Sequence, residues 1–336
     1  MAATKKRGQQ SVAFTNPPVI ASWASMAGPM EGKGPFGAEF DWVIEDYLFG
    51  EKSWEKAESK MMRETIRLSA RKLDLEDRDI QLILAGDLLN QIISSNFAAR
   101  ELSVPFLGLY GACSTLAEGL IIAGMLMDGG FYDRVAVGAS SHHHTAERQF
   151  RFPVELGVQR PPSAQWTVTG AGAIILCDSG PGLRITDATV GKVIDMGQSD
   201  VNDMGGAMAP ATADTLITHL QDLNRQPDYY DLIVTGDLGQ LGSALFNELC
   251  SNFGYNLGER HLDCGVVVYD PKQDVHAGGS GCGCSAIMIC GPCFSRMETG
   301  KIKRILLIGT GALMSPTTSM QGETIPSVAH AVVIEV

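Results

Sequence analysis

The chain repeats part of its own sequence, and this duplication constrains the fold more than any other feature. The segment LILAGDLLNQ recurs as LIVTGDLGQL, which aligns Asp87 with Asp237. GACSTLAEG ahead of RVAVGAS pairs with GCSAIMICG ahead of RILLIGTG, which aligns Cys113 with Cys284, and AGAIILCD pairs with the terminal AHAVVIEV. The offsets are 150, 171 and 158 positions. Three matches in one order with drifting offsets indicate an ancient duplication with loop insertions.

The duplication predicts two similar halves that pack face to face. With 336 residues, each half has an ordinary domain size and the chain can bury a large core. We place the boundary near residue 180, which gives an N-terminal half over 1–180 and a C-terminal half over 181–336.

Composition excludes several classes of partner. The formal charge of −12, from 38 acidic and 26 basic residues, argues against nucleic acid and against passive adsorption to anionic lipid. The longest apolar stretch, 116–127, is interrupted by Glu118 and by glycines, so no membrane span is expected. The start MAATKKRGQQ lacks the apolar core of a secretory signal, and the eight cysteines are therefore expected as reduced thiols in a cytosolic compartment.

The periodicity of apolar residues predicts the same order of elements, βαβαβαββ, in both halves. In the first half we expect strands at 18–22, 80–85, 105–110, 134–138 and 167–177, with helices at 53–73, 90–102 and 114–128. In the second half we expect strands at 183–196, 232–235, 265–269, 304–308 and 329–334, with helices at 211–223, 243–253 and 281–299.

Two of the predicted helices, 114–128 and 281–299, carry small residues where a surface helix would carry charge. Small side chains allow helices to approach closely, so we expect these two helices to contact each other between the sheets. Apolar runs without alternation, such as RILLIG, are typical of strands covered on both faces. The prediction is an α/β fold of five layers, α-β-α-β-α.

Cys113 stands where a predicted strand ends and a buried helix begins. A thiol at a helix N-terminus faces unpaired N–H groups and the positive end of the helix dipole, which would lower its pKa and favour a nucleophile. The alternative is a small buried cysteine that packs in a tight junction.

Eight longer motifs point to a known family. The motifs are GPMEGKGPFG, AGDLLNQ, FLGLYGACST, SSHHHTAERQFRFP, QWTVTGAG, DMGGAMAPATADT, AGGSGCGCSA and GTGALMSPTTSMQGE. With these motifs the chain resembles the stage V sporulation protein AD family of endospore formers, within the thiolase and ketoacyl synthase superfamily, and the resemblance spans nearly the whole chain. The resemblance implies the thiolase-like fold.

The superfamily's reaction needs a nucleophilic cysteine, an activating histidine and a second, proton-shuttling cysteine. Cys113 matches the first, and His276 in DVHAGGSGCG is a candidate base in a turn that is one residue short. The position expected for the second cysteine is occupied by Leu307 or Ile308. Without a positioned base and acid a thiol cannot turn over an acyl intermediate. We therefore interpret Cys113 as a vestigial nucleophile in a non-catalytic binding protein.

The resemblance implies a ligand, a location and partners. The ligand would be dipicolinic acid (pyridine-2,6-dicarboxylate), alone or as its calcium chelate, taken up into the forespore and released at germination. The protein would be a homodimer, peripheral to the spore inner membrane, beside other stage V A sporulation membrane proteins. No cofactor is implied.

A flat dicarboxylate calls for cationic forks, N–H donors and an apolar slot. The candidate ligand-binding residues are Asp87, Asn90, Cys113, His142, His144, Arg148, Arg151, Arg160 and Ser280. For each arginine the alternative is an ion pair at the surface or at a dimer interface. Asp87 and Asp237 could instead hold turns or cap helices, and we carry Asp87 forward as the one expected nearer to Cys113.

Two features suggest a metal site, and two other functions compete with ligand binding. Side chains of consecutive histidines diverge, so the triplet 142–144 predicts no metal site. The cysteines of the predicted helix 281–299 fit close packing better than zinc binding. The competing functions are a Cys-dependent acyltransferase acting on an acyl-coenzyme A thioester, with His276 or His142 as base, and a scaffold that binds no small molecule.

Overall fold

The computed structural model describes residues 4–150 and 160–336, and its two main sheets share one topology. Each has five strands, and in each the corresponding strands pair in the same order and the same directions. The first sheet runs β6-β5-β7-β9-β3 and contains β3 (Val19–Ala27), β5 (Leu82–Gly86), β6 (Phe106–Gly108), β7 (Arg134–Ser141) and β9 (Gly170–Cys177). The second runs β12-β11-β14-β15-β10 and contains β10 (Leu183–Thr189), β11 (Leu232–Thr235), β12 (His261–Asp263), β14 (Arg304–Ala312) and β15 (Ser327–Glu335).

Short strands connect and border these sheets. A brief antiparallel pairing of β10 with β3, Leu183 opposite Ile20, joins the two sheets. The N-terminal hairpin of β1 (Lys6–Arg7) and β2 (Ser11–Ala13) lies along β10. The remaining short strands are β4 (Trp42–Val43), beside β3, and the separate pair β8 (Trp166–Thr167) with β13 (Gly279–Ser280).

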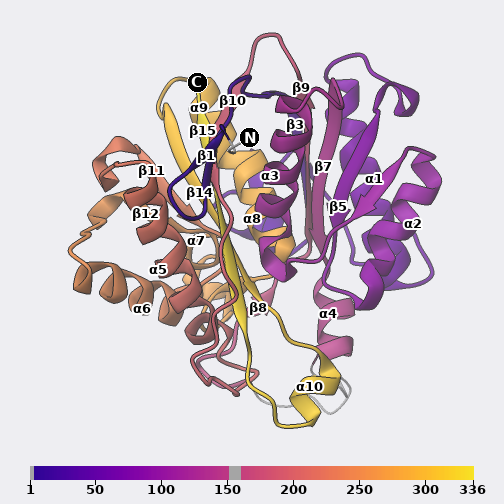
Figure 1. Ribbon diagram of the computed structural model, residues 1–336. Helices are drawn as coiled ribbons and strands as arrows, with labels where there is room; N and C mark the ends of the chain where they lie inside the picture. The colour runs from indigo at the N-terminus through magenta and orange to yellow at the C-terminus, as the bar shows by residue number, and fades with distance from the viewer. Residues whose placement is uncertain (1–3, 151–159) are drawn as a thin grey trace.

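The helices complete five layers, α-β-α-β-α, as expected (Figure 1). One outer layer holds α1 (Trp54–Arg71) and α2 (Ile93–Leu102), and the other holds α5 (Met204–Asp222) and α6 (Gly239–Asn252). Between the sheets lie α3 (Thr115–Asp128) and α8 (Cys282–Met288), which continues through a π-helical turn (Ile289–Cys293) into α9 (Phe294–Glu298). The short helices are α4 (His143–Phe150), α7 (Cys264–Val267) and α10 (Pro316–Met320).

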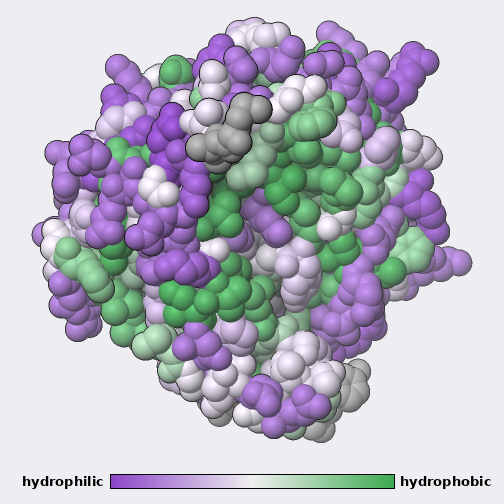
Figure 2. Space-filling view, in the orientation of Figure 1, coloured by the Kyte–Doolittle hydropathy of each residue, from purple (hydrophilic) through white to green (hydrophobic). Residues whose placement is uncertain are grey.

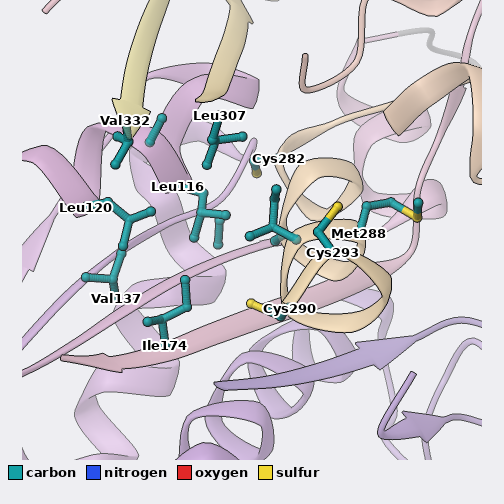
Figure 3. Close-up of a cluster of buried hydrophobic side chains, with 14 of the residues drawn as sticks. Leu116, Leu120, Val137, Ile174, Cys282, Met288, Cys290, Cys293, Leu307 and Val332 are labelled. Atoms are coloured by element: carbon teal, nitrogen blue, oxygen red, sulfur yellow. The ribbon is translucent and has the colours of Figure 1, made fainter. Parts of the chain in front are cut away.

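The central layer is close-packed because glycines in the strands make room for it. A Cβ on Gly309 of β14 would lie 2.8 Å from the Cβ of Ala117 in α3, and one on Gly172 of β9 would lie 2.5 Å from the carbonyl oxygen of Ala286 in α8. Leucines of α3 and cysteines of α8 and of the π-helical turn then meet apolar side chains from both sheets (Figure 3). This packing is what places the first turn of α3 at the centre of the molecule.

Most predicted elements are confirmed, and one is wrong. The predicted strand 265–269 begins instead as α7, and the strand β12 precedes it. The reason is Asp263, whose side chain accepts a hydrogen bond from the N–H of Val266 at 3.0 Å and so caps a helix where the run VVVY suggests a strand. No helix in the described parts of the chain is long and apolar enough to cross a membrane.

Candidate functional site

Cys113 lies in a tight turn between β6 and α3. The turn is a 3-10 helix, Ala112–Ser114, and Ala112 adopts a positive φ of 48°. Side-chain hydroxyls hold its shape: Ser114 donates to the carbonyl of Gly111 at 2.6 Å, and Thr115 donates to that of Ala112 at 2.7 Å. The sequence predicted this strand-to-helix position, and the structure confirms it.

The thiol borders a narrow cavity of about 50 Å³, room for a few water molecules. Its described walls are apolar apart from Glu147, the hydroxyl groups and the thiol itself. They comprise Leu88, Tyr110, Ala112, Cys113, Ala146, Glu147, Phe150, Thr167, Val201, Met204, Ser280, Gly281, Ala312 and Met314. Ligand sites commonly measure about 300–1,000 Å³, so this cavity must widen to admit a ligand.

The thiol of Cys113 lies beside the carboxylate of Asp237, which accepts a hydrogen bond from the N–H of Gly281 at 2.7 Å. Burial and the charge of the nearby Asp237 carboxylate raise the pKa of Cys113 well above its ordinary value. The expectation of a lowered pKa is therefore wrong. Loss of hydration and a neighbouring negative charge outweigh the helix dipole, which acts only over the first turn.

Asp237 was assigned only a capping role from sequence, yet it is the aspartate beside Cys113. It follows β11 and is fully buried, with its carboxylate accepting from Thr310 at 2.6 Å and from the N–H of Gly281 at 2.7 Å. Burial raises its pKa to about 6. The missed signal was the duplication itself, because the strand ends of one half face the buried helix of the other.

Asp87, expected nearer to Cys113, instead binds groups of its own half. Its oxygens accept from the N–H of Leu89 at 2.8 Å and from the N–H and hydroxyl of Ser95, each at 2.7 Å. It thus fixes the turn after β5 and the start of α2. The alternative reading of Asp87, a residue that holds a turn and caps a helix, is the one the structure supports.

Neither candidate histidine base reaches the thiol. The Nδ1 of His276 pairs with the carbonyl of Pro161 at 2.9 Å, and the Nε2 of His142 pairs with that of Tyr47 at 2.8 Å. His142 is fully buried, which lowers its pKa to about 4. Among the described residues that line the cavity, none is a histidine.

The other predicted ligand-binding residues are scattered. Ser280 lines the cavity, as expected. Arg148 forms an ion pair with Glu55 outside it, Arg160 lies over the ring of Trp166 at 5.0 Å, and Arg151 falls outside the described residues.

The remaining two, His144 and Asn90, do not line the cavity. His144 stacks on Trp54 with ring centroids 4.6 Å apart. Asn90 is exposed, and its N–H donates to the side chain of Gln149 at 2.9 Å.

The cysteines of α8 and the following turn are buried in the central layer. Cys282 donates through its thiol to the carbonyl of Ser140 at 2.8 Å, and Cys284 is likewise inaccessible. In the described ranges, no group of three or more histidine, cysteine or acidic side chains is placed to hold a metal ion. These cysteines pack the helix, which agrees with the packing interpretation.

Comparisons with known proteins agree with the motif resemblance. Residues 8–335 match the model of the family described as Stage V sporulation protein AD (SpoVAD). The chain is 47% identical over 331 residues, 98% of both proteins, to the stage V sporulation protein AD of Bacillus subtilis (strain 168).

Solved structures that superpose on this chain include condensing enzymes of low sequence identity. The 3-oxoacyl-[acyl-carrier-protein] synthase III from Aquifex aeolicus VF5 superposes with a TM-score of 0.57 at 14% identity, covering 95% of this chain and 100% of that chain. Xanthomonas campestris OleA with bound lauric acid and lauroyl-CoA gives 0.63 at 14% identity, covering 96% and 99%. The thiolase-like fold is therefore confirmed.

Proposed function

We propose that this chain, which belongs to the stage V sporulation protein AD family, uses a thiolase-like cavity to bind dipicolinate and performs no acyl transfer. In this proposal it takes part in uptake of dipicolinate into the forespore and in its release at germination. The family places the chain among sporulation proteins, and the arrangement around Cys113 supports binding over catalysis.

The single observation that carries the proposal is the Cys113–Asp237 pair. A nucleophilic cysteine reacts as the thiolate, which needs a lowered pKa or an adjacent base that removes the proton. Here burial and the negative charge of the neighbouring Asp237 carboxylate together raise the thiol's pKa. An acyl-enzyme would also need an acid for the leaving group, and the imidazoles of His142 and His276 are engaged elsewhere.

The cavity offers some of what a flat aromatic dicarboxylate needs. Tyr110, Phe150 and Met204 supply apolar and aromatic walls, which suits a planar ring. The described lining holds no lysine or arginine, so the ligand's charge must be met by a guanidinium at the rim or by bound calcium. Arg160 is the candidate at the rim, because Trp166 beneath it adjoins the lining residue Thr167.

Calorimetric titration of the purified chain with dipicolinate, with and without calcium, tests the proposal. We expect saturable binding, a raised melting temperature, and at least tenfold weaker affinity in Arg160→Gln. Arg148→Gln is the matched control and should keep wild-type affinity, since Arg148 pairs with Glu55. Absence of binding would refute the ligand assignment, and steady thiol release from acyl-coenzyme A that Cys113→Ser abolishes would support an acyltransferase.

The proposal includes a homodimer formed through β6. This strand ends the first sheet, with β5 as its neighbour in the sheet order, and Leu107 on it is 50% exposed. Phe97 of α2 and Tyr110 are also exposed beside it, and Figure 2 shows hydrophobic side chains gathered over α3. Antiparallel pairing of two β6 strands would give hydrogen-bond partners to the unpaired backbone groups of both edge strands.

Sedimentation of the purified chain should give a dimer that Leu107→Asp dissociates. A monomeric wild type would refute the proposed dimer.

The proposed location is the forespore side of the spore inner membrane, where the chain would be a peripheral component beside other stage V A membrane proteins. With a formal charge of −12, the attachment would be to proteins and not to anionic lipid. Fractionation of spores should find the chain with the inner membrane and released by high salt or by loss of those proteins. Its recovery in the soluble fraction of intact wild-type spores would refute this location.

A further inference from the structure

One wall of the cavity beside Cys113, the helix α4, is attached to the protein differently from the other walls. The floor of the cavity is built from the ends of central elements: Cys113 precedes α3, and Ser280 with Gly281 precedes α8. The opposite wall is α4, a helix of eight residues that contributes Ala146, Glu147 and Phe150. Since the cavity of about 50 Å³ is far smaller than a usual ligand site, at least one wall must move.

α4 is attached to the rest of the protein through polar contacts and through ring contacts, such as the stack of His143 on Trp166 with ring centroids 3.8 Å apart. The hydroxyl of Thr145 donates to Glu58 at 2.8 Å, and Arg148 pairs with Glu55 on α1. Two of its residues, Thr145 and Ala146, are buried. A helix with few buried apolar side chains belongs to the low-stability end of local opening.

Gln149 makes the contact that bridges α4 and the opposite lip of the cavity. Its Nε2 donates to the carbonyl of Leu88 at 3.1 Å, and its Oε1 accepts from the N–H of Asn90 at 2.9 Å. Leu88 itself lines the cavity. One side chain therefore fixes the distance between two walls of the site.

The segment that Gln149 grips is strained. Gln91 and Ile92 both have left-handed backbone conformations, with φ of 55° and 47°. That region is unfavourable for a β-branched residue such as Ile92. A strained segment held by side-chain hydrogen bonds can relax when those bonds are released.

We propose that α4 is the movable wall of the Cys113 cavity and that Gln149 is its latch. Release of the two Gln149 hydrogen bonds lets α4 separate from the 88–92 segment and widens the cavity from its closed volume to that of a ligand site. The inference rests on the proposed binding role of this cavity, but its test uses ligand-free protein, so the two can fail separately.

The test is the rate at which a neutral methanethiosulfonate reagent modifies Cys113, followed by peptide mass mapping in the ligand-free chain. Cys113 is 7% exposed in the closed form, so modification reports opening. Loss of two hydrogen bonds in Gln149→Ala should raise the rate about tenfold. Gln149→Met, which keeps the length of the side chain without its polar atoms, should behave alike.

Gln273→Ala is a matched control. Gln273 also donates to a backbone carbonyl, that of Met30 at 2.8 Å, and accepts from an N–H, that of Asp270 at 2.7 Å. This variant should leave the Cys113 rate unchanged. An equal increase in the control, or no increase in either Gln149 variant, would overturn the latch.

Hydrogen exchange of the wild-type chain gives a readout that needs no variant. The backbone amides of α4 should exchange at least a hundredfold faster than those of α3, because they open without global unfolding. Equal protection of the two helices would overturn the movable wall.

Discussion

Cys113 and its duplicate Cys284 in α8 derive from the same repeat, yet the first thiol borders the cavity and the second is fully buried. Cys113 retains 7% exposure, whereas Cys282 and Cys284 have none. Cys282 lies near an additional buried acid, Glu58, whose charge and that of Asp87 act on it. The duplication therefore placed a thiol near the start of both central helices. The side chains packed around each thiol determine whether it borders the cavity.

The two repeated aspartates show how the roles diverged. Asp87 accepts from the N–H of Leu89 at 2.8 Å within its own turn. In the second half the corresponding N–H, that of Gly239, is taken by Asp263 at 2.9 Å. Because Asp263 does the local capping there, the Asp237 carboxylate accepts instead from Thr310 and Gly281, and its charge acts on the thiol of Cys113. The same motif is a cap in one half and part of the site in the other.

The largest expected difference between the two halves is in the effect of replacing each repeated aspartate by asparagine. At position 87 one oxygen faces the N–H of Leu89 and the other faces Ser95, so an amide NH₂ would oppose a buried donor. We expect Asp87→Asn to lower the free energy of unfolding by about 3 kcal/mol. Asp237→Asn should lower it by less than about 1 kcal/mol, because the hydroxyl of Thr310 can turn to accept. Urea denaturation measures both, and equal losses would contradict the distinction.

The pH dependence of stability tests the role of Glu58, the buried acid near Cys282. Burial and the charge of Asp87 raise its pKa to about 8 from an ordinary value of 4.5. A raised carboxyl pKa stabilises the folded state fully below pH 4.5, and this stabilisation is lost as pH rises through 8. Relative to Glu58→Gln, the wild type should therefore lose roughly 3 to 4 kcal/mol of stability between pH 5 and 8.

Asp128 provides a control of opposite sign for that measurement. Its pKa is lowered by its partner Lys5 and by the N–H groups of Thr15 and Asn16, so its contribution is lost as pH falls below 3.8 and does not change between pH 5 and 8. Asp128→Asn should therefore differ from the wild type by a constant amount across that window. A flat difference for Glu58→Gln as well would show that Glu58 is already ionised at pH 5.

At the Cys113 cavity, removing the Asp237 charge should make the thiol more reactive. Asp237 raises the pKa of Cys113 by its charge. In Asp237→Asn we expect alkylation of Cys113 at pH 8 to be about tenfold faster, which corresponds to one pKa unit. Mass mapping identifies the cysteine, and slower alkylation in the variant would mean that Asp237 acts as a base.

The smallest expected effect is at Cys282. Cys282→Ala should change dipicolinate affinity less than about twofold, since Cys282 is fully buried and binds the carbonyl of Ser140. Cys113→Ala alters the cavity wall and should change the affinity more. A large loss of dipicolinate affinity in the Cys282 variant would contradict the assignment of the ligand to the Cys113 cavity.

The sequence was sufficient for the architecture because the signals that carry it are local and repeated. Apolar runs located β7 and β14, small residues located the central helices, and the strand-to-helix junction located Cys113. The strand predicted at 265–269 failed because a single cap, Asp263, overrides β propensity. Boundaries were less accurate, and α5 begins at Met204, ahead of Pro210, where the prediction began after it.

The site could be predicted only in part because its decisive contacts join the two halves. Asp237 and Cys113 are distant in sequence, and pairing them requires knowing which strand end faces which helix. The pKa of Cys113 likewise depends on burial, which no spacing reveals. Arg148 looked suitable for a carboxylate, but Glu55 in the first turn of α1 already binds it.

The central claim is that Cys113 is a protonated thiol beside a carboxylate and not a nucleophile. The pH dependence of Cys113 alkylation by iodoacetamide in the native chain, with Cys113→Ser as the blank, tests it directly. We predict a rate that is slow at pH 7 and still rising at pH 9.5, because burial and Asp237 raise the thiol's pKa. A rate that levels off below pH 8 would show a stabilised thiolate and contradict the account.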